Sequence, residues 1–335
     1  MRGKDMSKQL KNTMAAVMAG AMVFTMCSPA AAQAAGGGDE IPQLLAEFDF
    51  NGSISDGEID GGAAVANVNG TAVKLEEIED GDKALRFDGT AGNYLSLTKD
   101  DGSSLLTGKK EITISFDTKR ESDGTNWIFY AAPNDEAPIY NNEKYFACYS
   151  KEDPGIRVER YLNSGGRSEA IVGAADSDWV HVDVVVTEKA TGLLIDGELM
   201  DIEPSDYTIA DILGDNSIFY LGKANWGEYA DCWIDNFRIY DGRLPEAVNK
   251  MLWEGVSLPT DPIKDDLELP DTNTLGDTVT WTSGNRNIIA DDGTLKDLLA
   301  ANTEVTMTAK IGDQTKTFTV TAAGAKGLLQ EAYDG

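Results

Sequence analysis

The stretch EITISFDTK, residues 111–119, alternates apolar and polar side chains along the chain. Ile112, Ile114 and Phe116 point to one side of an extended backbone, and the polar residues between them point to the other. This spacing predicts a β-strand with one face in a hydrophobic core and the other face in water.

Runs of the same kind surround this stretch, and Gly, Asn and Asp separate them. They include ALRFDG (84–89), YLSL (94–97), WIFYAA (127–132), KYFACYS (144–150), IRVERYL (156–162), WVHVDVVVT (179–187), GLLIDGEL (192–199), IFYLGK (218–223) and WIDNFRIYD (233–241). Many short strands bounded by turn residues are typical of an all-β sandwich or barrel.

The chain beyond these runs contains one helix and a second, smaller β unit. LPEAVNKMLWEG (244–255) predicts a helix, because Pro245 suits a first turn, apolar residues form a stripe and a glycine ends it. Residues 255–264 contain two prolines and no periodicity, which indicates a linker. Residues 265–323 hold further strand candidates, the last two joined by a Gly-Asp pair that signals a two-residue hairpin.

The first 34 residues predict a signal peptide. A basic start precedes the apolar run MAAVMAGAMVFTM, and Ala32-Gln33-Ala34 supplies a cleavage site of the A-x-A kind. We therefore expect an exported protein that is secreted or held at the cell surface. No later stretch approaches the roughly 18 consecutive apolar residues of a membrane span.

The end of the chain echoes the start of the first β unit. LLQEAYDG (328–335) is similar to LLAEFDFNG (44–52). We therefore expect residues 324–335 to be a tail in which a further module begins, and the chain to be a fragment of a longer protein.

The chain is strongly acidic, with 57 Asp and Glu against 28 Lys and Arg and a formal net charge of −29 at pH 7. Such a surface repels nucleic acid and anionic membranes, so we expect no nucleic acid partner. It is compatible with neutral glycans and offers carboxylates to calcium, and it also serves solubility alone.

Several stretches resemble, in their order, the laminin-G-like, concanavalin A-like jelly rolls of bacterial exoproteins. The resemblance covers about residues 41–254. It rests on ALRFDGTAGNYLSL, EITISFDTK, WVHVDVVV, LLIDGEL and the closing segment IFYLGKANWGEYADCWIDNFRIYDGRLPEAVNKMLWEG. One departure is Cys232, where this family usually has glycine. The resemblance implies an all-β fold with a concanavalin A-like jelly-roll sandwich.

Residues 265–323 resemble the atrophied bacterial immunoglobulin-like domain. LELP, VTWTSGN, DDGTL and VTMTAKIGDQTKTFTVTA occur in that family's order, with Trp281 at the position of its core tryptophan. This implies a small immunoglobulin-like β-sandwich. Proteins with both modules are commonly secreted hydrolases of plant polysaccharides, in which these modules flank a catalytic domain. The resemblance thus implies a neutral plant-type polysaccharide and an attached or adjacent glycoside hydrolase domain as partners.

The stretch SDGEIDGG (55–62) matches half of two functional motifs and completes neither. An EF-hand loop that starts at Asp56 needs an acidic ligand at its twelfth position, where Asn67 stands. A jelly-roll glucanase strand that starts with Glu58-Ile-Asp60 needs another Glu directly afterwards, and Gly-Gly-Ala-Ala follows. Retaining hydrolysis needs two carboxyl groups about 5 Å apart. No strand supplies such a pair, so no catalytic residue is predicted.

The jelly-roll resemblance implies a different calcium site. Asp49, Asp60 and Asp235 match positions that often lie near a bound calcium ion in related jelly rolls. The alternative is that Asp49 and Asp60 are solvated turn residues and Asp235 caps its strand. A structural Ca²⁺ is the one cofactor predicted.

His181 is the single histidine, and no nucleophilic Ser or Cys is indicated beside it, so we expect a structural or surface role. One histidine also leaves no Cys/His cluster for zinc. Cys148 and Cys232 remain after signal cleavage, and their spacing leaves open whether they form a disulfide.

Aromatic residues beside Gly and Asn predict a ligand site. Sugars stack their C–H faces on rings, while amides and carboxylates bind their hydroxyls. The candidates are Trp127, Tyr130 and Tyr145 in one segment and Asn225, Trp226 and Tyr229 in another. Trp226 and Tyr229 lead, because they lie in a loop. The alternative for any one ring is core packing.

These features together predict an exported, non-catalytic carbohydrate-binding or accessory protein, as a fragment or front end of a polysaccharide-degrading enzyme. Two alternatives stay open. One is a glycoside hydrolase of the arabinofuranosidase or xylosidase type whose catalytic domain lies outside this chain. The other is a cell-surface spacer or adhesion protein that binds another protein.

Overall fold

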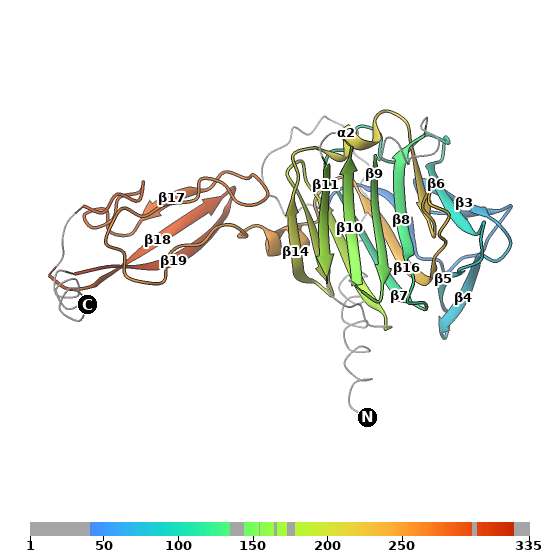
Figure 1. Cartoon of the computed structure of the whole chain (residues 1–335), viewed down its shortest axis with the longest axis horizontal. Helices are drawn as coiled ribbons and strands as arrows, with labels where there is room; N and C mark the ends of the chain where they lie inside the picture. Colours follow the sequence, from blue (N-terminus) through green and yellow to red (C-terminus); the bar gives the residue numbers. More distant parts are fainter. Residues whose placement is uncertain are drawn as a thin grey trace, which may run out of the picture. The chain divides into compact units, whose positions relative to one another are not determined.

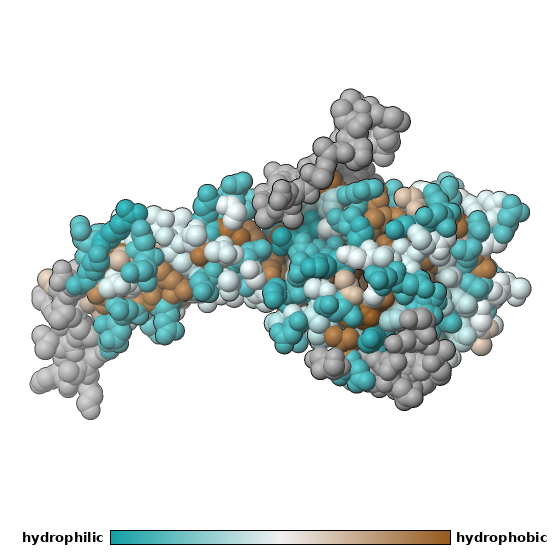
Figure 2. Space-filling model, turned by 90° about the horizontal axis from the view of Figure 1, so that it is seen from above, coloured by the Kyte–Doolittle hydropathy of each residue, from teal (hydrophilic) through white to brown (hydrophobic). Residues whose placement is uncertain are grey.

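A computed structural model describes residues 41–134, 144–153, 155–163, 166–172, 178–296 and 300–324 (Figure 1). The signal peptide predicted at residues 1–34 lies outside these ranges, as does the predicted tail beyond residue 324. Within the described part, no helix is long and apolar enough to cross a membrane. Hydrophilic residues cover much of the face in Figure 2, and the apolar ones show in separate patches.

Two eight-stranded antiparallel sheets form the first β unit (Figure 1). Sheet A has the order β14-β13-β12-β7-β16-β5-β4, and β1 also pairs with β16. Its strands are β1 (Leu44–Phe48), β4 (Lys74–Glu79), β5 (Asp82–Asp88), β7 (Ile112–Arg120), β12 (Val180–Val186), β13 (Ala190–Ile195), β14 (Glu198–Pro204) and β16 (Asp231–Tyr240).

Sheet B has the order β11-β10-β9-β8-β15-β6-β3-β2. Its strands are β2 (Glu58–Asp60), β3 (Ala64–Asn69), β6 (Tyr94–Lys99), β8 (Asn126–Pro133), β9 (Tyr145–Lys151), β10 (Gly155–Leu162), β11 (Gly166–Val172) and β15 (Ser217–Leu221). The short helix α2 (Ile209–Leu213) precedes β15, and α3 (Pro245–Met251) follows β16 where a helix was predicted.

The hydrophobic core lies between the two sheets. Ile112, Ile114 and Phe116 on β7 are fully buried there, which confirms the inward face predicted for this strand. Phe129 and Phe146 come from sheet B and belong to the same cluster. Alternation along each strand therefore sends one set of side chains into a shared interior.

The opposite face of β7 is not wet, contrary to the prediction. The Thr113 hydroxyl donates to the Gly242 carbonyl (2.9 Å) and accepts from the Leu244 amide (3.0 Å), where the chain enters α3. Ser115 lies 3.3 Å from the His181 ring on β12. Alternation gives a strand two faces, and tertiary structure decides what covers the second one.

Arg160 is a fully buried cation that joins the two sheets. Its guanidinium donates to the carbonyl oxygens of Ala190 (2.9 Å), Thr187 (3.1 Å) and Tyr207 (2.7 Å) and to the hydroxyl of Thr191 (3.2 Å). Burial lowers the pKa of Arg160 to about 10. These acceptors offset the loss of water around the buried charge.

The two cysteines among the described residues, Cys148 on β9 and Cys232 on β16, are free and buried in this core. Burial raises the pKa of each thiol, that of Cys232 to about 12. Cys148 and Cys232 therefore form no disulfide with each other in this structure, and their side chains pack as small apolar groups.

The second β unit is a three-stranded antiparallel sheet with strands β17 (Thr280–Ser283), β18 (Thr303–Ile311) and β19 (Gln314–Ala322). Ile311 pairs with Gln314, so the predicted two-residue hairpin forms at Gly312. Trp281 packs against the buried hydrophobic cluster of this second unit, and its indole donates to the Pro270 carbonyl (2.8 Å).

We expect the substitution Arg160→Met to lower the free energy of unfolding by about 3–5 kcal/mol, because it strands the buried carbonyls that now accept from the guanidinium. Arg238→Met is the matched control: Arg238 pairs with the half-exposed Glu47 at 2.9 Å, and such pairs contribute about 1 kcal/mol or less. Urea unfolding monitored by tryptophan fluorescence measures both. Equal losses in the two variants would contradict the role assigned to Arg160.

Candidate functional site

A second buried cluster lies on the face of sheet B that points away from the core. We call it the aromatic layer and define it as Trp127, Tyr130, Tyr145, Tyr149, Tyr161, Tyr220 and Trp226. All eight residues of β8 are buried, because the core covers one face of this strand and the aromatic layer covers the other. The densest aromatic packing outside the core therefore lies over the middle of this sheet.

Trp226 reaches this layer from the loop between β15 and β16. Its indole is stacked on that of Trp127, with ring centroids 5.1 Å apart and an interplanar angle of 25°. It meets Tyr130 at 5.5 Å and Tyr145 at 5.0 Å in edge-to-face geometry. Trp226 is half-buried, whereas Trp127, Tyr130 and Tyr145 are at most 6% exposed.

Two glycines shape the loop that carries Trp226. Gly222 (φ +87°) and Gly227 (φ +82°) occupy the left-handed region, and a Cβ at residue 222 would lie 2.6 Å from the Phe87 ring. The amide of Ala230 donates to the Gly222 carbonyl (2.8 Å), which closes the loop at its base. Above that base, the Trp127 indole donates to Glu228 of the loop (2.9 Å).

Asn126 anchors the strand ends beneath this loop. Its amide nitrogen donates to the carbonyls of Ser122 and Gly124, each at 3.0 Å. Its amide oxygen accepts from the Asp231 amide (2.7 Å) and the Ser122 hydroxyl (3.1 Å). The side chain is fully buried and ties the turn before β8 to the start of β16.

The buried tyrosine hydroxyls of the layer differ in how they are satisfied. Tyr145 and Tyr149 donate to the carboxylate of Glu159, at 2.7 Å and 3.2 Å. The Tyr130 hydroxyl is buried without a hydrogen-bond partner. Burial raises the pKa of all three phenols, so each stays protonated at neutral pH.

A row of charges borders the aromatic layer on β10 and β11. Glu159 and Glu169 are direct cross-strand neighbours. Arg157 lies 3.6 Å from Glu159 and 3.4 Å from Glu169, and Arg167 lies 3.3 Å from Glu169. Both carboxylates therefore already have partners within the chain, an arrangement that suits fixed hydrogen bonding better than proton transfer.

The sequence did not single out these charges. The polar positions of IRVERYL alternate with its core positions, and this alternation places Arg157, Glu159 and Tyr161 on one face. Alternation could not show that Glu169 lies opposite Glu159, because the sequence does not determine the register in which the next strand pairs with this one.

The structure brings four of the six predicted ligand residues together: Trp127, Tyr130, Tyr145 and Trp226 all belong to the aromatic layer. Asn225 precedes Trp226 in the loop and is half-buried. Tyr229 lies at the base of the loop, where its backbone pairs with Lys223. Three of the rings are too buried to offer an open stacking face in this conformation, so Trp226 is the most accessible of the four.

The aspartates predicted to bind calcium have other partners. Asp49 and Asp60 each accept from the backbone amide two residues later, at 3.0 Å and 2.9 Å. Asp235 is 2% exposed and accepts from the Asn236 amide (2.8 Å). Across the described ranges, no three His, Cys, Asp or Glu side chains gather in a group that could hold a metal ion. These bonds show how the three aspartates are held, and a calcium ion bound by them stays a prediction.

His181 lies on the outer face of sheet A between two carboxylates. Its Nδ1 is 2.7 Å from Asp117, and its Nε2 is 3.5 Å from Asp183. Burial alone would lower the pKa of His181, but its bonds to the two carboxylates outweigh burial and raise that pKa to about 10. The charged ring bridges neighbouring strands, a structural role of the kind that was predicted.

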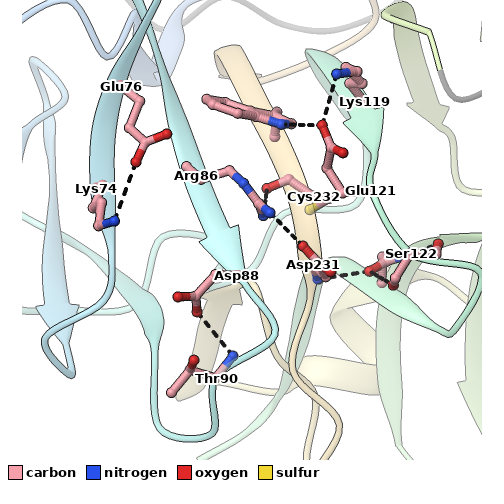
Figure 3. Close-up of polar contacts among 12 residues, drawn as sticks. Lys74, Glu76, Arg86, Asp88, Thr90, Lys119, Glu121, Ser122, Asp231 and Cys232 are labelled. Atoms are coloured by element: carbon pink, nitrogen blue, oxygen red, sulfur yellow. Dashed lines mark hydrogen bonds and ion pairs between the residues drawn. The ribbon is translucent and has the colours of Figure 1, made fainter.

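The outer face of sheet A also carries the indole of Trp233, which lies among paired side chains. Figure 3 shows two of these pairs, Arg86 with Asp231 and Glu121 with Lys119. Arg86 lies 5.2 Å over this ring and donates to Asp231 at 2.7 Å. The Trp233 indole donates to Glu121 (2.7 Å), which also accepts from Lys119 (2.8 Å). Because every polar group in these pairs is engaged, the aromatic layer on sheet B is the stronger candidate for a ligand site.

Comparison with known proteins agrees with this architecture. Residues 88–247 match the family model of the concanavalin A-like lectin/glucanases superfamily, and residues 257–324 match that of the atrophied bacterial Ig domain. The chain therefore carries a concanavalin A-like domain followed by an atrophied bacterial Ig domain, which confirms the predicted order. None of the curated proteins matches the sequence.

Several solved structures are similar in fold. One is domain 4 of AbnA, a GH43 extracellular arabinanase from Geobacillus stearothermophilus, in complex with arabinotriose; it is 17% identical, with a TM-score of 0.46 over 62% of this chain and 98% of that one. Another is the receptor binding domain of botulinum neurotoxin D, 15% identical, with a TM-score of 0.42 over 76% and 70% of the two chains. A third is the CBM40 of the Ruminococcus gnavus IT-sialidase bound to α2,3-sialyllactose, 19% identical, with a TM-score of 0.40 over 49% and 92%. Likeness at this level says nothing about the ligand of this chain.

The raised pKa of His181 makes part of the stability depend on pH. A folded-state pKa of about 10, against an ordinary value of about 6.5, means that the contribution is complete below about pH 6.5 and is lost as the pH rises through 10. We expect the stability difference between the wild type and His181→Gln to shrink by about 4 kcal/mol between pH 6 and pH 10, because each pKa unit corresponds to about 1.4 kcal/mol. Urea unfolding at both pH values measures it, and a difference that does not change with pH would contradict the charged bridge.

Proposed function

We propose that this chain is an exported, non-catalytic accessory protein whose concanavalin A-like domain binds a neutral glycan on the outer face of sheet B, at Trp226. The observation that supports this most is the aromatic layer itself, which gathers seven rings on the second face of a sheet whose first face already supplies the core. A sandwich needs only one apolar face on each sheet to fold. A second one calls for another explanation, and ligand binding supplies it.

The chemistry around the layer suits a sugar. Trp226 is half-buried, so part of its indole is open to a sugar's C–H face. Tyr161 and Tyr220 are also half-buried, and the cations of Arg167 and Lys223 lie over their rings. Asn225 lies in the same loop as Trp226, and the charged row at Arg157 and Glu169 offers donors and acceptors for the hydroxyl groups of a sugar. A few polar groups beside exposed rings are the usual composition of a small-ligand site.

The glycan we propose is neutral because of the protein's charge. A net charge of −29 at pH 7 repels a polyanion such as a polyuronate, and this repulsion weakens as salt is added. A neutral plant-type polysaccharide such as arabinan, xylan or β-glucan meets no such barrier.

Binding without catalysis is favoured by the state of the carboxylates. Glu159 and Glu169 are the two that meet on this face, and arginines and tyrosines already hold them. We propose that hydrolysis, where it occurs, belongs to an attached or adjacent glycoside hydrolase domain, with the Ig-like domain as a spacer. The order of basic, apolar and Ala-x-Ala elements in residues 1–34 supports the proposed export.

A structural calcium ion stays a prediction. Asp49, Asp60 and Asp235, the residues implied for it, each accept from a backbone amide in this structure. A chelator added to the binding assay tests it independently of the aromatic layer.

We expect at least one of three neutral polysaccharides, arabinan, xylan and β-glucan, to retard the protein when cast in a native gel. Pectin, an acidic polysaccharide, should not retard it. Trp226→Ala should weaken the binding at least about tenfold, or about 1.4 kcal/mol, because it removes the exposed stacking face. Trp233→Ala is the matched control, since it removes a half-buried indole from the outer face of sheet A. Sugar release should be absent in all samples.

Three outcomes would count against this function. Retardation by none of the neutral polysaccharides would leave a spacer or adhesion protein as the better account. Release of reducing sugar by the chain would contradict the non-catalytic role. Equal loss of binding in the two tryptophan variants would place the site elsewhere.

A further inference from the structure

The hydroxyl of Tyr130 is the unexplained group of the aromatic layer. Tyr130 is fully buried, with 0% of its surface exposed, and its hydroxyl has no hydrogen-bond partner. Leaving a buried hydroxyl unpaired costs free energy, and such groups are rare in native proteins. A Phe at this position would fill the same space without that cost, so the hydroxyl needs a reason beyond packing.

The strand register shows what lies beside this hydroxyl. Tyr130 on β8 is opposite Ala147 on β9, and Ala147 is opposite Glu159 on β10. A small side chain thus stands between two large ones in a row across the sheet. The next row along the strands holds Trp127, Tyr149 and Arg157.

Bulky groups therefore surround Ala147 on the outer face, and we call this small, fully buried residue the floor between them. Tyr145, two residues before Ala147 on the same strand, borders the floor on the remaining side. Ala147 and Trp226 belong to the same buried cluster. The centroid of the Trp226 ring is 5.0–5.5 Å from those of Trp127, Tyr130 and Tyr145, so its indole occupies the space that these rings enclose.

A second polar atom on this face is also unpaired. The Nε of Arg157 is buried without a partner, although the rest of the guanidinium pairs with Glu159 and Glu169. Two unpaired donors on one face of one sheet, beside a loop indole that packs against three buried rings, point to a ligand with its own hydroxyl groups.

We propose that Trp226 is a displaceable plug over a sugar subsite, with Ala147 as the floor and the Tyr130 hydroxyl as the group that binds a sugar hydroxyl. The inference deepens the proposed function and rests on it. When the glycan binds, the indole leaves the floor and turns its face onto the sugar, which then lies between Trp226 and the buried rings. The hydroxyl of Tyr130 gains the partner that it lacks in the free protein.

The loop is built to allow this movement. Gly222 and Gly227 lie on either side of Trp226 and take backbone conformations that other residues rarely adopt. The base stays fixed by the bond from Ala230 to Gly222, while the bond from Trp127 to Glu228 must break. Gly227 and Glu228 are exposed, so the tip of the loop can move without disturbing the core.

The test uses Tyr130→Phe in the full chain, with Tyr145→Phe as the matched control. Both variants remove one hydroxyl from the same layer, but the Tyr145 hydroxyl donates to Glu159 at 2.7 Å whereas that of Tyr130 is unpaired. We expect Tyr130→Phe to raise the unfolding midpoint of the free protein by about 2 °C and to weaken glycan binding about tenfold. Tyr145→Phe should lower the unfolding midpoint.

A second readout needs no ligand. In Tyr130→Phe, the conformation in which Trp226 packs on the buried rings no longer contains an unpaired hydroxyl. That conformation is therefore more stable, and the loop should open less often. Hydrogen exchange of the peptide that covers residues 222–230 should therefore slow about fivefold, while β16 beyond residue 231 exchanges as in the wild type.

The outcomes separate this inference from the proposed function. If Trp226→Ala abolishes binding while Tyr130→Phe binds as the wild type does, the function stands and the subsite is overturned. If the wild type binds no neutral glycan, both the proposed function and the sugar as occupant of this subsite are wrong. Hydrogen exchange of residues 222–230 then decides whether Trp226 is a displaceable plug. Unchanged exchange, or a lower unfolding midpoint in Tyr130→Phe, overturns the plug.

Discussion

The guanidinium of Arg160 sets the register of β10, and the outer face of sheet B depends on that register. Four oxygen atoms from other segments accept from this side chain inside the sandwich. Because strand side chains alternate, a slip of one residue would expel the guanidinium from these acceptors and leave a buried charge unsatisfied. With Arg160 fixed inward, its neighbours Glu159 and Tyr161 must point outward, toward the aromatic layer.

That outward carboxylate then organises the rings. Glu159 is 3% exposed and accepts from the hydroxyls of Tyr145 and Tyr149, which fixes two rings on the adjacent strand. The Trp226 indole packs against Tyr145 and stacks on Trp127. A chain of contacts thus runs from a cation inside the sandwich to a loop tryptophan on its surface, and the proposed glycan site lies at the end of this chain.

Much of the fold could be predicted from the sequence, because alternation and turn residues are local. EITISFDTK gave its inward face correctly, and Gly and Asn marked Trp226 as a loop residue. What covers the second face of a strand is not local, so the wet face expected for β7 was wrong: α3 and His181 cover it. In β8 the register shifts between Trp127 and Phe129, and no alternation could show that both faces are buried.

The candidate site was predicted in part for the same reason. Ring-bearing residues beside glycine are visible in a sequence, and four of the six proposed ligand residues do meet. Their burial, and the contribution of Arg157 and Glu159, depend on strand pairing that only the structure reveals. The sequence could not show that the Tyr130 hydroxyl is unpaired, because a tyrosine has the same letter whether or not its hydroxyl is hydrogen-bonded.

The indole N–H signals of the six tryptophans test the central claim most directly. Each part of the molecule has its own reporter: Trp127 and Trp226 on the outer face of sheet B, Trp233 on that of sheet A and Trp281 in the Ig-like domain. In a ¹H–¹⁵N titration with a soluble neutral oligosaccharide, the account predicts shifts for Trp127 and Trp226 and none for Trp233 or Trp281. Shifts centred on Trp233 or Trp281, with Trp226 unmoved, would contradict it.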